Sequence, residues 1–172
     1  AFPDMKPGAP DPKFALIPDA QRGRAAAFAP GGGYARMLAN RPLLMKVGDT
    51  VFVHGGILPK HVAYGLDKMV DEVAAWMRGE RPSPPEIVVA EDGPIWMRAY
   101  SDNPGPTECA MLSSVLGSLG AKRMVMGHTV QKGGVTSACD GKAWRIDVGL
   151  AHVYGGPTQE LEVAGEAVVV KK

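Results

Sequence analysis

The hydrophobic and polar positions along the chain predict a mixture of strands and helices. Two strand-like runs, residues 43–47 and 50–54, are joined by a Gly-Asp pair, which is typical of a β-hairpin. The second run is almost wholly apolar and ends at His54, so we expect a buried strand. In residues 64–78 the apolar positions recur at helical spacing, which predicts an amphipathic helix that Gly79 ends.

The second half of the chain predicts another helix and more strands. Residues 107–119 carry an apolar stripe and follow Pro106, so we expect a helix with Thr107 as its N-cap residue. A short apolar strand at 123–126 leads into Gly127 and His128. Two further hairpins are predicted from strand-like runs at residues 135–138 and 142–148, and at 161–163 and 167–170.

This order of elements predicts a mixed α/β fold, in which a mixed sheet packs against flanking helices. Residues 1–23 are rich in proline and lack periodicity, so we expect a loop or arm there. Residues 24–172 are expected to form part of a single domain. Residues 80–94 are again rich in proline, which predicts a loop with at most a short strand at 87–89.

Composition and charge exclude several classes of function. The 172 residues carry a formal net charge of +1 with both signs interspersed, so we expect neither a nucleic-acid partner nor a membrane surface. No apolar stretch approaches the roughly 18 residues of a membrane span, and no signal peptide is visible. Cys109 and Cys139 fall in different predicted elements and are expected to be free thiols. A reducing, cytoplasmic location is therefore expected.

Two histidines occupy equivalent positions at the ends of apolar strands. His54 precedes a Gly-Gly pair, and His128 follows Gly127. A side chain at a strand end is held by a rigid element and opens into the loop layer, where a neutral imidazole can bind Zn, Mn or Fe. Taken alone, a histidine at a strand end is more often a hydrogen-bonded structural residue than a metal ligand, and the occurrence of two such ends strengthens the metal interpretation. No local cluster completes a metal site, so any metal would need carboxylate or amide ligands from elsewhere.

The sequence around both histidines resembles motifs of a known family. Residues 51–59, VFVHGGILP, resemble the HGG motif of the calcineurin-like metallophosphatases, in their phosphoprotein phosphatase branch, and residues 126–131 resemble the later GH motif. Residues 94–101, PIWMRAYS, and residues 145–149, RIDVG, resemble the bacterial-type group often called Shewanella-like protein phosphatases. The resemblance covers roughly residues 34–165, with the motifs in matching order and spacing.

The resemblance implies that His54 and His128 are direct ligands of a two-metal centre containing Mn, Fe or Zn. Such a centre hydrolyses phosphate monoesters with a metal-activated water, on a phosphorylated protein or a small phosphomonoester. The resemblance also makes Arg98 a candidate for phosphate binding, because its planar guanidinium matches phosphate geometry, and Tyr154 a candidate to border the active site. The alternatives are a structural salt bridge for Arg98 and an exposed loop position for Tyr154. Asp147 either orients a ligand histidine or closes a hairpin.

Three earlier motifs of that family, GDxHG, GDxxDRG and GNHE, are absent from the sequence, and the chain does not begin with Met. The catalytic His/Asp pair that handles the leaving-group proton is absent with them. We therefore expect the C-terminal half of a metallophosphatase αββα sandwich, which is inactive alone. Two alternatives stay open: a non-catalytic metal-binding or interaction fragment, and a dinucleotide polyphosphate hydrolase or phosphodiesterase of the same superfamily.

Overall fold

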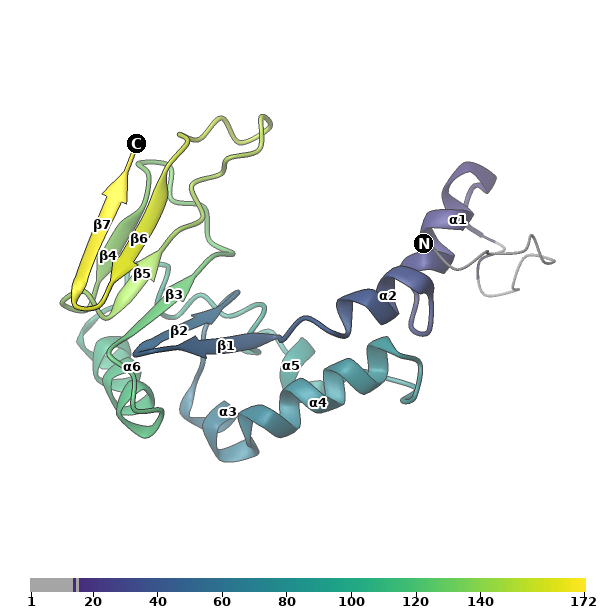
Figure 1. The fold of residues 1–172 in the computed structure, drawn as a ribbon, viewed down its shortest axis with the longest axis horizontal. Coiled ribbons are helices and arrows are strands. Elements are labelled where there is room, and N and C mark those ends of the chain that lie inside the picture. Colours follow the sequence, from purple (N-terminus) through teal and green to yellow (C-terminus); the bar gives the residue numbers. More distant parts are fainter. Residues whose placement is uncertain (1–13, 15) are drawn as a thin grey trace. The chain divides into compact units, whose positions relative to one another are not determined.

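The computed structural model describes residues 14 and 16–172, which divide into two compact units (Figure 1). Most of the expected amino-terminal arm lies outside these described residues. The first unit consists of the described residues up to Pro42 and of Asp67–Pro85, and the second of Leu43–Leu66 and Glu86–Lys172.

The second unit is built on a five-stranded mixed sheet with strand order β1-β2-β3-β5-β4. Strands β2, β3 and β5 run parallel, while β1 and β4 pair antiparallel at the two edges. The predicted mixed sheet and all three predicted hairpins are thus confirmed, the last one as a separate two-stranded sheet. The strands are β1 (Leu44–Val47), β2 (Thr50–Val53), β3 (Arg123–Met126), β4 (Thr136–Ala138), β5 (Ala143–Arg145), β6 (Glu160–Ala164) and β7 (Ala167–Lys171).

The core lies between this sheet and helix α6 (Pro106–Ser118). Every residue of β3 is buried, and its side chains at Met124 and Met126 share one cluster with Leu112 and Leu116 of α6. Removing this apolar surface from water is the main stabilising contribution to the unit. The buried β3 therefore provides a rigid support for the residues at both of its ends.

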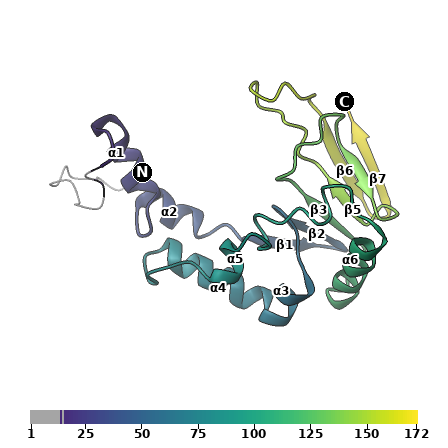
Figure 2. The same cartoon turned by 180° about the vertical axis from the view of Figure 1, so that it is seen from behind.

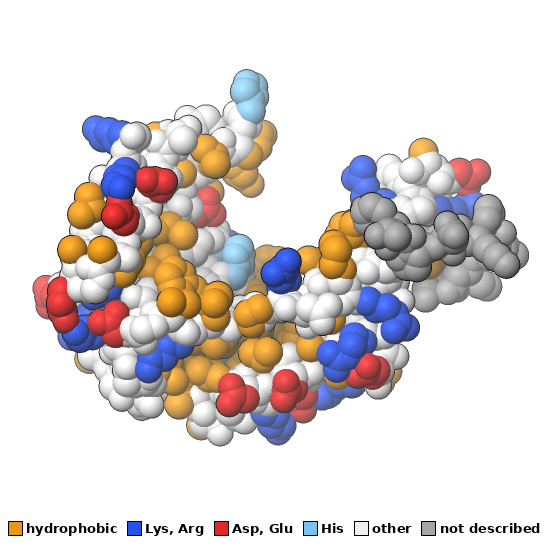
Figure 3. All heavy atoms as spheres, viewed as in Figure 1, with side chains coloured by type: hydrophobic (Ala, Val, Ile, Leu, Met, Phe, Trp, Pro, Cys, Tyr) orange, Lys and Arg blue, Asp and Glu red, His pale blue; other side chains and the backbone are white. Residues whose placement is uncertain are grey.

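Strand β1 forms an edge of the sheet and is much less buried than β2. The side chains of Met45 and Val47 remain 48% and 54% exposed. Figure 3 shows hydrophobic side chains gathered on the surface over the region of β1 and β2. The β6–β7 hairpin instead lies beside β5 in both views of the ribbon (Figures 1 and 2).

The first unit is helical, with α1 (Asp19–Phe28), α2 (Gly33–Leu38) and most of α4 (Leu66–Met77). Helix α1 begins inside the segment that the sequence predicted as a loop. A Cβ atom on Gly32 would lie only 2.2 Å from the carbonyl oxygen of Ala26, so the tight connection between α1 and α2 requires glycine.

The helix predicted at 64–78 is confirmed as α4, and a separate short helix, α3 (Pro59–Tyr64), precedes it because Gly65 with φ of 99° interrupts the helical path. The loop predicted at 80–94 is wrong in part. Residues Glu86–Val89 form the single-turn helix α5 rather than a strand or loop, closed by a bond from the Ala90 N–H to the Glu86 carbonyl. Proline-rich flanks conceal so short a helix from periodicity.

Helix α6 also begins differently from the prediction. Its N-cap residue is Gly105 rather than Thr107, and Pro106 occupies the first helical position, for which its fixed φ is suited. The carboxylate of Glu108 accepts the Gly105 N–H at 2.8 Å. This bond is one half of a capping box, and because Gly105 has no side chain, nothing takes the place of the hydroxyl cap that was expected from Thr107.

The two cysteines are bonded to each other, so the prediction of free thiols is wrong. Cys109 lies in the first turns of α6, and Cys139 lies in the turn between β4 and β5. Their Cα atoms are 5.1 Å apart although 30 positions separate them in the sequence. The parallel pairing of β3 with β5 brings the two elements together, and a spacing pattern cannot reveal it. The cysteines therefore give no support to a reducing compartment.

Among the described residues, no helix combines the length and the apolar character that a membrane crossing requires.

Candidate active site

His54 and His128 lie side by side at the carboxyl ends of two neighbouring parallel strands. Nε2 of His54 is 3.0 Å from Nδ1 of His128, and the ring centroids are 4.8 Å apart. The register pairs Val53 with Met126, so β2 and β3 end at the same level, and the Gly127 N–H extends the ladder to the His54 carbonyl at 2.9 Å. The structure thus brings together two side chains that are 74 positions apart.

The backbone at His128 is in a rare conformation. Its φ is 64°, and the Thr129 N–H donates to the Gly127 carbonyl at 2.7 Å. A bond between residues two apart, around a central residue with positive φ, is the strained form of the γ-turn. For a residue other than glycine such a conformation costs on the order of 1–3 kcal/mol, and it persists where surrounding contacts enforce it, often at functional sites.

The surrounding contacts are a hydrogen-bond network centred on Gln131. Its amide nitrogen donates to the carbonyls of Thr129 at 2.9 Å and of Ser101 at 3.2 Å, and its amide oxygen accepts the Thr136 hydroxyl at 3.0 Å. The hydroxyls of Ser101 and Thr129 are also 2.7 Å apart. Gln131 therefore joins the turn that carries His128 to β4 and to the segment that ends at Ser101.

Residues 94–98 are held against the glycine pair that follows His54. The carbonyl of Pro94 accepts the N–H groups of Gly55 at 2.7 Å and Gly56 at 3.1 Å. A Cβ atom on Gly55 would lie 2.9 Å from the Met97 carbonyl oxygen, so only glycine permits this approach. The requirement for glycine in the His-Gly-Gly sequence is thus a packing requirement.

This packing places Trp96 against His128. Their rings meet edge to face, with centroids 5.6 Å apart, and Trp96 remains 49% exposed. The sequence patterns do not predict this contact of Trp96 with the histidine. The sequence patterns also do not identify the polar residues of the Gln131 network, Ser101, Thr129 and Gln131. Their position inside the two segments that resemble family motifs was the one feature of the sequence that could have indicated them.

Arg98 is exposed beside this pair of rings. Its guanidinium donates to the Trp96 carbonyl at 3.3 Å, and no ion pair in the described part of the chain engages it. The alternative of a structural salt bridge is therefore not seen among these residues. An arginine without a carboxylate partner is free to bind an anion, and phosphate binding by Arg98 stays a prediction.

The electrostatic environment favours a neutral His128. Burial, and then the positive charge of Arg98 and the charge that His54 can carry, lower the pKa of His128, while Asp147 opposes them. Its Nε2 atom is buried and has no hydrogen-bond partner within the described structure. A buried ring nitrogen without a partner calls for an explanation, and a neutral imidazole is the form that binds a metal.

The two rings fit part of a metal site. Two nitrogen ligands about 2.1 Å from one ion are about 3.0–3.4 Å apart, close to the 3.0 Å between Nε2 of His54 and Nδ1 of His128. The shared ion would therefore bind Nδ1 of His128, not its buried Nε2. Within the described residues, however, no group of three His, Cys, Asp or Glu side chains could hold an ion. Asp147 instead accepts the Gly149 N–H at 3.0 Å. These residues therefore supply two ligands, and their role stays a prediction.

Tyr154, the remaining predicted site residue, lies in a compact loop that the Gly156 N–H closes on the Gly149 carbonyl at 2.9 Å. It is 67% exposed, its N–H donates to the Ala151 carbonyl, and its Cβ lies against Gly149. These contacts are within its own loop. No contact with His54 or His128 is among them, so a role of Tyr154 at the active site stays a prediction.

Comparisons with known proteins found relatives that are named as phosphatases. The chain is 39% identical over 135 residues to Shewanella-like protein phosphatase 2 of Arabidopsis thaliana, covering 76% of this chain and 34% of that protein. It is 27% identical over 140 residues to Shewanella-like protein phosphatase 1 of Plasmodium berghei, covering 74% of this chain and 38% of that protein. No family model matches the chain.

Solved structures show a related fold. The cold-active protein-tyrosine phosphatase of a psychrophilic Shewanella species superimposes with a TM-score of 0.61 at 21% identity, over 77% of this chain and 41% of that one. At this identity the likeness concerns the fold alone. The chain is therefore related to proteins named as phosphatases, and it spans little more than a third of the length of these relatives.

Proposed function

We propose that this chain is the C-terminal portion of a metal-dependent phosphoesterase of the Shewanella-like protein phosphatase group, within the calcineurin-like metallophosphatases. The substrate would be a phosphate monoester, carried by a protein or a small molecule. The proposal rests on the 3.0 Å distance between Nε2 of His54 and Nδ1 of His128 at adjacent strand ends. Arg98 lies beside them and has no ion-pair partner among the described residues. The named relatives support the class of reaction.

Each residue of the site would have a separate task. His54 and His128 would each donate a ring nitrogen to a metal, and Trp96 would hold the His128 ring and exclude water from its edge. Two metal ions of Mn, Fe or Zn would supply an activated water and neutralise phosphoryl charge. Arg98 would bind the phosphoryl oxygens through two parallel N–H groups. The remaining ligands and the acid for the leaving group would come from residues outside this chain.

Metal binding by the chain tests the role of the histidines. Titration calorimetry with Zn²⁺ should detect weak binding, which His54→Ala and His128→Ala both abolish. His152→Ala is the matched control, because His152 is exposed in the loop that contains Tyr154. Unchanged Zn²⁺ binding by the His128→Ala variant would contradict the proposed ligand pair.

Turnover tests the class of reaction. The chain alone should hydrolyse p-nitrophenyl phosphate at a negligible rate with Mn²⁺, whereas a longer protein that adds the three missing motifs should hydrolyse it. In that longer protein, loss of a metal ligand should lower kcat by orders of magnitude. Faster hydrolysis of dinucleotides than of phosphopeptides would favour the dinucleotide polyphosphate hydrolase instead.

A second candidate function is a non-catalytic metal-binding fragment. It is favoured by the absence of a third ligand near the histidines within the described residues. A parent gene without GDxHG upstream of this segment would support it. The presence of that motif, with the turnover described above, would reject it.

A further inference from the structure

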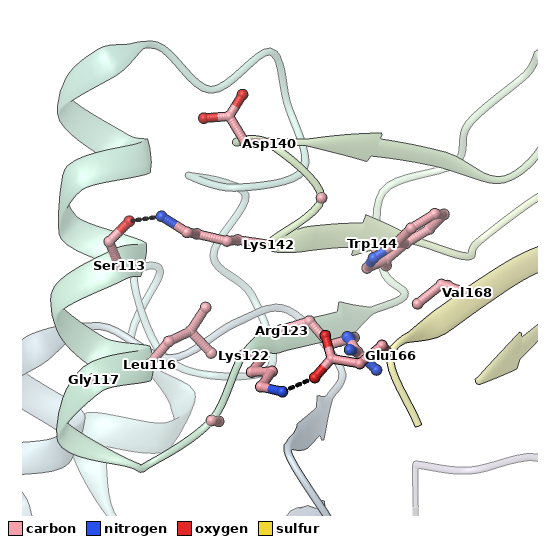
Figure 4. Close-up of a pocket in the computed structure, with 12 residues that line it drawn as sticks. Ser113, Leu116, Gly117, Lys122, Arg123, Asp140, Lys142, Trp144, Glu166 and Val168 are labelled. Atoms are coloured by element: carbon pink, nitrogen blue, oxygen red, sulfur yellow. Dashed lines mark hydrogen bonds and ion pairs between the residues drawn. The ribbon is translucent and has the colours of Figure 1, made fainter. Parts of the chain in front are cut away.

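A pocket lies between helix α6 and the starts of β3 and β5 (Figure 4), whereas the two histidines follow the other ends of β2 and β3. Its volume is about 630 Å³, within the range of about 300–1,000 Å³ that small-molecule sites occupy. Helix α6, the beginnings of β3 and β5, and the β6–β7 turn supply its lining. Because His54 and His128 follow the ends of β2 and β3, this pocket is separate from the candidate active site.

Two of the three cations that line the pocket are already neutralised. Lys122 pairs with Glu166 and with Asp49, and Arg123 pairs with Asp49 and donates to the Gly165 carbonyl at 3.0 Å. Figure 4 shows Lys122 and Glu166 meeting at the pocket wall. These groups join the β1–β2 turn, β3 and the β6–β7 turn, and their charge is not available to a ligand.

Lys142 is the third cation, and it forms no ion pair within the described residues. Its ammonium donates to the Ser113 hydroxyl at 2.9 Å, and that hydroxyl donates in turn to the Cys109 carbonyl at 2.8 Å. Across the described residues no carboxylate pairs with Lys142, and Figure 4 shows the Asp140 side chain directed away from it. An ammonium has three N–H donors, so two remain for an acceptor in the pocket.

Apolar side chains line the other side of the pocket, away from α6, toward which the Lys142 side chain extends. Trp144 of β5 and Val168 of β7 form one wall, and Leu116 of α6 lies on the helix side (Figure 4). The flat indole of Trp144 offers a surface on which an aromatic ring can stack. A pocket with a fixed cation on one side and an apolar wall on the other selects molecules that carry an anionic group on an apolar body.

We propose that this pocket binds a small organic anion, a carboxylate on a flat aromatic body. The carboxylate accepts hydrogen bonds from the free N–H groups of Lys142, and the aromatic ring packs against Trp144. Ser113 contributes by holding the ammonium in place. This proposal does not depend on the phosphatase function, because the pocket shares no residue with the histidine site.

The test follows the three tryptophan indole N–H resonances of the isotopically labelled chain during titration with cinnamate. Trp144→Phe identifies the resonance of interest, and Trp76 and Trp96 serve as internal controls. Cinnamate should shift the Trp144 resonance saturably. Cinnamamide, which has the same body without the charge, should bind at least about tenfold more weakly, because it lacks the charge-assisted bond.

Substitutions at the cation give a second readout. Lys142→Met should weaken cinnamate to the level of cinnamamide, whereas Lys142→Arg should keep the affinity within about threefold of the original chain. Equal affinities for the acid and the amide on the unsubstituted chain would overturn the proposal, whatever the variants do. It would also be overturned if millimolar cinnamate shifted no indole resonance, or only those of Trp76 and Trp96.

Discussion

The Gly55 N–H donates to the Pro94 carbonyl at 2.7 Å, and this bond fixes residues 94–98 next to His54. The same segment carries Trp96, which contacts His128, and Arg98, which lies beside it. The backbone N–H of Gly55 thus helps to position residues 94–98 against the ends of β2 and β3. The site is assembled from three segments, and the contact between Gly55 and Pro94 joins two of them.

Replacement of Gly55 should therefore disturb both stability and the site. In Gly55→Ala the new methyl would lie 2.9 Å from the Met97 carbonyl oxygen and 3.0 Å from that of Pro94, so backbone must move. We expect a loss of about 1–3 kcal/mol in the free energy of unfolding, measured with urea. The Trp96 indole resonance should shift at the same time.

Gly117→Ala is the matched control for that measurement. Gly117 lies within α6, and nothing approaches within 4 Å of a Cβ built on it. Alanine there should stabilise the chain by about 0.5–1 kcal/mol, because glycine is unfavourable inside a helix. A loss of stability in Gly117→Ala as large as that in Gly55→Ala would show that close packing is not the cause.

The strained turn at His128 predicts an unusual order of stabilities. His128→Ala and His128→Gly both remove the ring, but only glycine adopts a φ of 64° without a steric penalty. The glycine variant should therefore be more stable than the alanine variant by about 1 kcal/mol in urea unfolding. If alanine proves equal or better, the γ-turn is not under strain.

Stability should fall in mild acid because of His61. This side chain is fully buried, its Nδ1 accepts the Leu58 N–H at 3.0 Å, and burial, with the charge of Lys60, lowers its pKa from 6.5 to about 4. As pH falls, His61 becomes protonated at a higher pH in the unfolded chain than in the folded chain. The contribution of neutral His61 to the free energy of unfolding is therefore complete above pH 6.5 and is lost as pH falls toward 4. The slope should approach about 1.4 kcal/mol per pH unit, or about 3 kcal/mol in all.

Urea unfolding at about pH 7.5, 6, 5 and 4.5 covers the expected transition and measures this slope. His61→Leu should flatten it, whereas His152→Ala should leave it unchanged because His152 is exposed. An unchanged slope in His61→Leu would assign the acid sensitivity to other groups.

The disulfide predicts a large dependence of stability on redox state. It closes a loop with a separation of 30 residues, so its removal should release chain entropy in the unfolded state. We expect the double variant Cys109→Ser, Cys139→Ser to lose about 3–4 kcal/mol relative to the oxidised chain. Reductant should destabilise the original chain by a similar amount and leave the double variant unaffected.

Sequence patterns located most strands because their apolar character is local. The hairpins at Gly48, Asp140 and Gly165 and the buried strand β3 follow from alternation and turn residues alone. The start of α6 was misplaced by two residues because Pro106 occupies the first helical position and Thr107 therefore lies inside the helix. Local sequence does not report whether a proline precedes a helix or begins it.

The candidate site was predictable only in part, for a related reason. His54 and His128 stood out because each ends an apolar strand beside glycine. Their proximity depends on the parallel pairing of β2 with β3, a contact between distant segments. The Gln131 network and the disulfide depend on the same kind of long-range contact, which neither periodicity nor residue spacing encodes.

The exposed edge at β1 has a consequence for handling the isolated chain. Its outer backbone N–H and C=O groups, flanked by the half-exposed Met45 and Val47, form a template on which a second copy can align as a sixth strand. Self-association should therefore increase with concentration, and a single lysine in place of Val47 should suppress it by introducing charge repulsion between the paired copies.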